Sequence, residues 1–140
     1  ILESGMALLC VDTDHFQWIE DHLGEEGSAS TLRKVAGHLR ESLPESSIAG
    51  RYGMDRFAAV LSGCDGDTAV QTAESMRESL AERSREWTPD GDPVTVSIGL
   101  AFTENEKLDS ELIRRLLDEA DRCLHIAKAE GRNCTRWGRL

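Results

Sequence analysis

The chain lacks several features that would assign it to a class at once. Aromatic residues make up only 5% of its 140 residues, and proline occurs just three times. No apolar run approaches the ~18 residues of a transmembrane helix, and no signal-peptide pattern opens the chain. We therefore expect a cytoplasmic segment that makes no contact with a membrane.

An excess of positive charge is also absent. The chain carries 16 Lys and Arg against 26 Asp and Glu, a net charge of −10. Broad binding to nucleic acid requires a basic face, so this balance argues against it. A single nucleotide is still compatible, because a metal ion and one or two local cations can hold its phosphates.

The four cysteines show neither CxxC nor Cys/His ligand spacing. Cys10 and Cys123 fall in apolar patterns and are expected to be small core residues. A reducing compartment is the simplest inference.

The length fits one domain over 1–140 with a core of its own. Since the chain begins Ile1-Leu2-Glu3 rather than with Met, we expect it to be excised from a longer multidomain protein.

Apolar periodicity and turn residues predict an order β-α-α-β-β-α-β-α-β. This corresponds to an α+β fold: a ferredoxin-like βαββαβ core with an added helix and strand, and an antiparallel-rich central sheet flanked by helices. The expected strands are 6–11, 47–51, 57–61, 94–101 and 133–137. The expected helices are 14–22, one capped by Ser28 or Ser30 and ended by Pro44, one led by 65–67, and one capped by Ser110 and stopped by Gly131. Residues 87–93 are expected to form a loop, Gly99 a bulge or close backbone contact, and Trp18 a packing residue.

Two carboxylates stand at strand ends and turns. Asp12 follows a buried strand, and Asp55 lies in a hairpin turn. If that hairpin pairs beside the first strand, the two converge, and the backbone carbonyl of Thr13 could complete a set of oxygen ligands for Mg²⁺. Acidic residues in such positions are more often solvated or capping groups, so the residues alone leave both interpretations open.

Four stretches in the right order carry a resemblance that covers most of the chain. They are 11–16 (VDTDHF), 53–57 (GMDRF), 96–99 (VSIG) and 120–133 (ADRCLHIAKAEGRN). The chain resembles the GGDEF family, the diguanylate cyclase domains of bacterial signalling proteins. The resemblance implies that two GTP-loaded domains meet face to face and form cyclic di-GMP with Mg²⁺. It also implies a homodimer in the full-length protein, and an attached sensor or EAL domain.

The resemblance assigns roles to residues one by one. The family's metal site matches Asp12, Thr13 and Asp55, and Asp55 would be catalytic in an active enzyme. The cations that hold the triphosphate match Lys128 and Arg132. From the residues alone, this pair also fits the cations that favour a helix C-terminus.

The expected guanine pocket is altered. Glu20 stands where the family has Asn, and Ala29 stands where it has Asp. Ala29 offers no hydrogen bond, whereas Glu20 can still accept from the base. Each polar edge left unpaired weakens binding by about 1–3 kcal/mol.

The signature is altered at two of its five positions, Met54 and Arg56. A tight turn often needs positive φ, and Met54 in such a conformation would cost on the order of 1–2 kcal/mol. Arg56 replaces an acidic residue. If it points at the site, it opposes Mg²⁺; it could instead contact a phosphate and favour nucleotide without metal.

These observations favour a degenerate GGDEF domain, impaired in catalysis, that regulates an attached domain through dimerisation or weak GTP binding. Two alternatives stay open. One is an active diguanylate cyclase that makes cyclic di-GMP and pyrophosphate from two GTP. The other is a structural interaction module without nucleotide.

Overall fold

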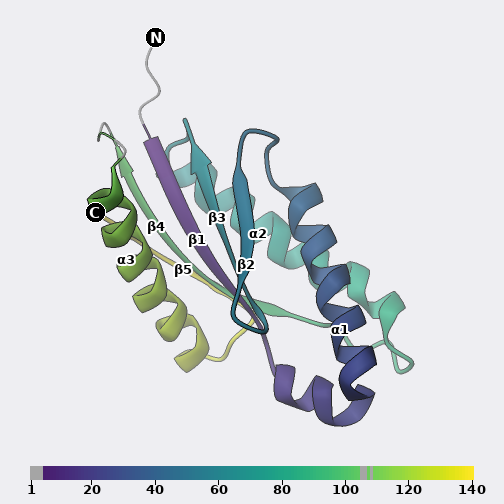
Figure 1. Cartoon of the computed structure of the whole chain (residues 1–140). Helices are drawn as coiled ribbons and strands as arrows, with labels where there is room; N and C mark the ends of the chain where they lie inside the picture. The colour runs from purple at the N-terminus through teal and green to yellow at the C-terminus, as the bar shows by residue number, and fades with distance from the viewer. Residues whose placement is uncertain (1–4, 105–106, 108) are drawn as a thin grey trace.

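A computed structural model of the chain describes residues 5–104, 107 and 109–140. Five strands form one sheet in the order β2-β3-β1-β4-β5 (Figure 1). The strands are β1 (Gly5–Thr13), β2 (Ile48–Tyr52), β3 (Arg56–Ser62), β4 (Val96–Glu104) and β5 (Thr135–Arg139). All pairings are antiparallel except that of β4 with β5, as the predicted antiparallel-rich sheet requires.

The central strand β1 is buried along most of its length because helices cover both faces of the sheet. Ala7, Leu9 and Val11 pack with residues of α1 (Phe16–Ser42) and α2 (Gly66–Arg83) on one face. Leu8 and Cys10 pack with α3 (Ser110–Ala129) on the other. Figure 1 shows α3 on its own side of the sheet and α1 and α2 on the opposite side. The α+β class predicted from the sequence is confirmed.

Helix α1 corresponds to the two helices expected from the sequence, joined end to end. Gly24 interrupts it with φ 76° and ψ −178°, which lies outside the helical region. The second segment does not begin at a serine cap, since the Ser28 hydroxyl donates to the Glu25 carbonyl at 3.1 Å from inside the helix. Gly24 supplies the break because glycine tolerates positive φ.

The two other long helices have aspartate caps. Asp65 accepts a hydrogen bond from the Thr68 backbone N–H and Asp109 from that of Leu112, each at 2.8 Å. The expectation that Ser110 caps α3 was wrong, because Ser110 is the first helical residue and Asp109 does the capping. A short 3-10 helix, η1 (Ser84–Trp87), precedes the predicted loop.

Gly99 of β4 marks a close approach of backbone, as its position in a strand predicted. A Cβ built there would lie 2.0 Å from the Ala120 carbonyl oxygen and 2.3 Å from the Leu124 nitrogen. Helix α3 can therefore lie directly against β4. Within the part of the chain that the structure describes, no helix is long and apolar enough to cross a bilayer.

Candidate functional site

The candidate site lies where β1 ends and β3 begins. The antiparallel register of these strands places Asp12 directly opposite Arg56, so the two side chains share one face of the sheet. Arg56 Nε donates to Asp12 Oδ1 at 2.6 Å, and Nη2 donates to Oδ2 at 2.9 Å. This is the two-pronged geometry in which arginine binds carboxylate most strongly.

Helix α3 adds a second cation and a second carboxylate from above the same face. Lys128 Nζ forms an ion pair with Asp12 Oδ2, and Arg56 Nη1 lies 3.3 Å from Asp121 Oδ1. The guanidinium carbon of Arg56 also lies 5.6 Å from the ring centroid of Tyr52, within the range of a cation–π contact. Arg56 is thus held by β1, β2 and α3 together.

These contacts set the charge of the site. Asp12 is only 4% exposed. Burial raises the pKa of Asp12, but hydrogen bonds from Arg56 and Lys128 outweigh it and hold the pKa below its usual range. The hydrogen bond to Asp12 raises the pKa of Arg56 against the opposing effect of desolvation. Both groups are therefore ionised near neutral pH.

The turn between β2 and β3 differs from the strained turn expected from the sequence. Gly53 takes the positive φ, 75°, whereas Met54 is not among the described non-glycine residues with positive φ. The Met54 side chain is 63% exposed. Arg51 Nη2 donates to the Met54 carbonyl at 2.6 Å, and the Thr13 N–H donates to the Asp55 carbonyl at 3.1 Å. The turn is thus tied to both neighbouring strands without a strained methionine.

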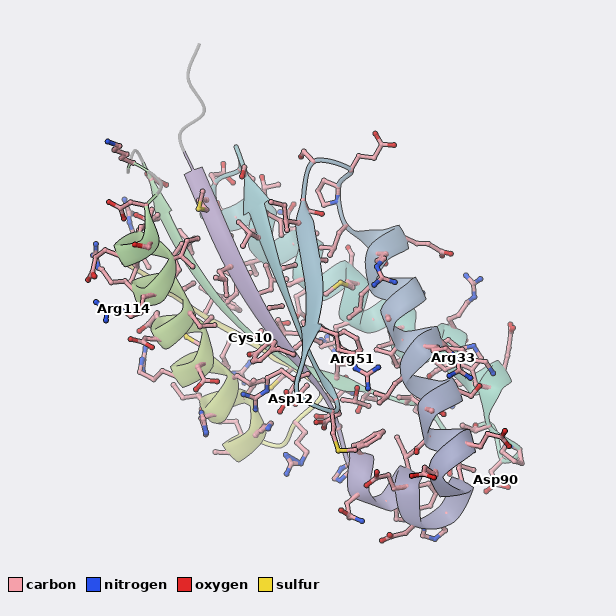
Figure 2. All side chains as sticks on the ribbon, viewed as in Figure 1. Cys10, Asp12, Arg33, Arg51, Asp90 and Arg114 are labelled. Carbon is pink, nitrogen blue, oxygen red and sulfur yellow. The ribbon has the colours of Figure 1, made fainter. Side chains whose placement is uncertain are left out.

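One cavity of about 520 Å³ gathers most of the residues that the sequence singled out, at the edge of the sheet where Figure 2 labels Asp12. A volume of this size falls in the range of small-molecule sites. The predicted residues that line it are Asp12, Thr13, Glu20, Met54, Asp55, Lys128 and Arg132. Ala29 is not among its lining residues and lies farther along α1, beyond the break at Gly24.

Arg132 faces this cavity from the connection between α3 and β5. Its backbone has φ 64°, just after Gly131 at φ 117°. Among the described residues, neither Arg132 nor Asp55 forms an ion pair, so both charges are available to a ligand. The sequence placed Lys128 and Arg132 four residues apart at a helix end, and in the structure Lys128 lies in the last turn of α3 while Arg132 follows the end of the helix.

Asp14 is a part of the site that sequence reasoning passed over. It is 5% exposed, and its carboxylate accepts from the Thr95 hydroxyl at 2.7 Å, the Ser97 hydroxyl at 2.6 Å and the Asn133 N–H at 3.0 Å. Its position two residues after Asp12 in 11–16 was the available signal. Asp14 therefore ties the segment between β1 and α1 to the start of β4 and to the connection between α3 and β5.

The chain's own residues, as arranged, do not fit a Mg²⁺ ion at Asp12. The ion needs carboxylate oxygens that are free to coordinate, but cationic side chains already engage both oxygens of Asp12. Over residues 5–104, 107 and 109–140, no three His, Cys, Asp or Glu side chains cluster in a way that could hold a metal. The guanidinium of Arg56 and the ammonium of Lys128 supply the positive charge next to Asp12.

Comparisons with known proteins identify the family of this chain and support its fold. The chain is 33% identical over 129 residues to diguanylate cyclase DosC of Escherichia coli, covering 91% of this chain and 27% of that protein. It is 29% identical over 128 residues to diguanylate cyclase A of Treponema denticola, covering 91% and 34%. It thus spans about a third of the length of the curated relatives it matches.

Solved structures give the same result. The GGDEF domain of DgcB from Caulobacter crescentus, in complex with c-di-GMP, superposes with a TM-score of 0.83 at 26% identity, covering 96% of this chain and 78% of that one. The family model for the diguanylate cyclase GGDEF domain matches residues 2–134. Members of this family act in cyclic di-GMP signalling and are generally Mg²⁺-dependent. The chain belongs to the diguanylate cyclase GGDEF domain family.

Proposed function

We infer that this domain is a degenerate, regulatory GGDEF domain that has lost most or all diguanylate cyclase activity. The observation that carries the proposal is the contact between Arg56 and Asp12, which joins an altered signature residue to the carboxylate expected to bind metal. A divalent ion at this carboxylate would have to displace the guanidinium. At about 5 Å and an effective dielectric near 20, Arg56 would also repel each unit of metal charge by roughly 3 kcal/mol.

The altered guanine pocket points in the same direction. Glu20 lines the cavity, but no hydrogen-bonding side chain stands at Ala29. Losing one or two base contacts weakens GTP binding by roughly tenfold or more. Lys128 and Arg132 still line the cavity, which supports weak binding of a nucleotide's phosphates in place of turnover.

The features that the domain keeps support a regulatory role. The domain keeps the fold and the cations Lys128 and Arg132. The carboxylate expected to bind metal, Asp12, is instead neutralised by Arg56 and Lys128 of the same chain. We propose that the domain forms a homodimer in the full-length protein and controls an attached sensor or EAL domain. Any GTP it binds would then act as an effector.

The first experiment measures cyclic di-GMP formation by the full-length protein with GTP and Mg²⁺. We expect no steady production above background. Sustained turnover that depends on Asp55 would overturn the proposal and establish the active-cyclase alternative.

The second experiment tests the role of Arg56 through metal binding. The Tm is measured with and without Mg²⁺ in the absence of nucleotide. We expect no Mg²⁺-dependent rise for the wild type and a clear rise for Arg56→Glu, which removes the guanidinium from Asp12 and adds a carboxylate, leaving Lys128 as the one cation paired with Asp12 among the described residues. Arg33→Glu is the matched control, since it makes the same charge change at an exposed position of α1. A rise in the wild type that Asp12→Asn abolishes would contradict the proposal.

A further inference from the structure

A second hollow lies on the other side of the first segment of α1. It measures about 460 Å³ and runs between this segment and the loop that leads from η1 to β4. Figure 2 labels Asp90 beside the first part of α1, on this loop. We call the hollow the α1–loop trough. Its apolar lining comes from Trp18, Ile19, Leu23, Pro89, Pro93 and Val94.

The helical wall of the trough exposes large apolar side chains. Trp18 is 55% exposed and Leu23 is 40% exposed. The rings of Trp18 and His22 are stacked, with centroids 3.9 Å apart and an interplanar angle of 18°, and His22 Nδ1 donates to the Trp18 carbonyl at 2.9 Å. The stacking orders the indole and leaves it accessible, although the sequence predicted a packed Trp18.

The loop between η1 and β4, which forms the second wall of the trough, is held in place by hydrogen bonds of its own. The Thr88 hydroxyl donates to the Asp92 carbonyl at 2.8 Å, and the Gly91 N–H donates to the Thr88 carbonyl at 3.2 Å. Arg85 Nη1 reaches the Gly91 carbonyl at 3.0 Å. A partner would therefore meet a largely ordered surface, and preorganisation lowers the entropic cost of binding.

The charge of the trough selects the kind of partner. Asp90 and Asp92 line it, while no Lys or Arg does. Neither carboxylate forms an ion pair with any described residue. An exposed indole face next to free carboxylates favours a cation, and the same charges disfavour a phosphate or an anionic lipid. An apolar floor under an acidic rim is complementary to an aliphatic side chain flanked by basic ones.

We propose that the α1–loop trough is a docking site for a basic peptide segment of a partner, anchored by an aliphatic side chain between Trp18 and the loop. Lysine or arginine residues of that segment pair with Asp90 and Asp92. The trough and the nucleotide cavity are two hollows that meet at three shared lining residues.

Docking in the trough also reaches the nucleotide cavity. Asp14, His15 and Trp18 line both hollows, and His15, with φ 55°, forms the joint between β1 and α1. An occupant of the trough would therefore contact residues that also line the nucleotide cavity.

The test uses three synthetic twelve-residue peptides added to the ¹⁵N-labelled protein without nucleotide. One alternates Leu and Arg, the second replaces every Arg with Glu, and the third replaces every Leu with Ser. Amide and indole NMR shifts report both affinity and place. We expect saturable binding of the Leu/Arg peptide, with shifts centred on Trp18, His22 and residues 88–95. We expect no saturable binding of the other two.

Variants separate this site from general attraction to an acidic protein. Trp18→Ala and the double variant Asp90→Asn, Asp92→Asn should each weaken binding by about tenfold, without loss of the folded spectrum. The matched controls are Trp137→Ala, which removes another exposed indole, and Asp118→Asn on α3. They should bind as the wild type does.

Several results would overturn the proposal. They are an absence of binding by the Leu/Arg peptide at millimolar concentration, equal binding by the Ser/Arg peptide, and equal weakening in the control variants. Tighter binding of the Leu/Glu peptide would indicate an anionic partner and would also reject it. None of these outcomes bears on cyclase activity, so the proposed function stands or falls separately.

Discussion

Arg56 and Asp12 face each other across the β1–β3 pair and are joined by two hydrogen bonds of 2.6 and 2.9 Å. The strand register brings the two residues together, because residues directly opposite in an antiparallel pair have neighbouring side chains. A glutamate at position 56 would place its carboxylate next to that of Asp12, and the two negative charges would need a bound cation between them. With arginine at this position, the side chain itself provides the positive charge next to Asp12.

The pH dependence of stability should report on this contact. The pKa of Asp12 is lowered in the folded protein, so its charged form stabilises the fold. That contribution is fully present above the usual carboxyl pKa and is lost as the pH falls through the lower folded value. Urea unfolding of wild type and Asp12→Asn should therefore differ by about 2 kcal/mol at neutral pH, a value reduced because the partner cations are partly exposed.

The difference between the two proteins should shrink as the pH falls below the usual carboxyl pKa and through the lower folded pKa of Asp12. A difference that grows on acidification would mean that Asp12 is not held ionised by its cations.

Met54→Gly tests whether the altered turn is strained. Because Met54 does not have positive φ and is exposed, glycine relieves nothing there and only adds freedom to the unfolded chain. We expect a loss of about 0.5–1 kcal/mol in the free energy of unfolding. A gain of that size would show that the methionine is strained after all.

Gly99→Ala should be severely destabilising. The added methyl group would collide with the backbone of α3 at Ala120 and Leu124, which cannot move without separating the helix from β4. We expect a loss of about 3 kcal/mol or more, read from chemical denaturation.

Gly37→Ala is the control for Gly99→Ala, because no heavy atom lies within 4 Å of the built Cβ in α1. It should be neutral or stabilising by up to about 1 kcal/mol. Similar losses in the two variants would remove the steric explanation.

The cap of α3 can be assigned by comparing adjacent substitutions. Asp109→Ala removes the acceptor of the Leu112 N–H and should lower stability by about 1 kcal/mol. Ser110→Ala changes the first helical residue and should have little effect. A larger loss of stability in Ser110→Ala than in Asp109→Ala would show that Ser110 is the cap, as the sequence suggested.

The resemblance to the family singled out Asp12, Asp55, Lys128 and Arg132, and these four residues line one cavity. What it could not supply was the direction of Arg56, which depends on the β1–β3 register and on Asp121 from α3. The sequence offered Arg56 two targets, the metal or a phosphate. The structure adds a third, the carboxylate of Asp12.

Local errors in the fold have similar causes. Aspartate and serine are both favoured N-cap residues, so the sequence pattern could not show whether α3 begins after Asp109 or after Ser110. Trp18 was expected to pack because aromatic residues usually do, but it stacks on His22 at the surface. Nothing in the apolar pattern distinguishes a buried indole from one that lines an open hollow.

Asp14 has a consequence for how a ligand could enter. Its carboxylate binds the backbone of Asn133, the neighbour of Arg132, and also Thr95 and Ser97 of the β4 side. The backbone next to Arg132 is therefore held against the sheet. Met54 also lines the cavity and is 63% exposed, so its flexible side chain is the part of the lining that can move aside when a ligand enters.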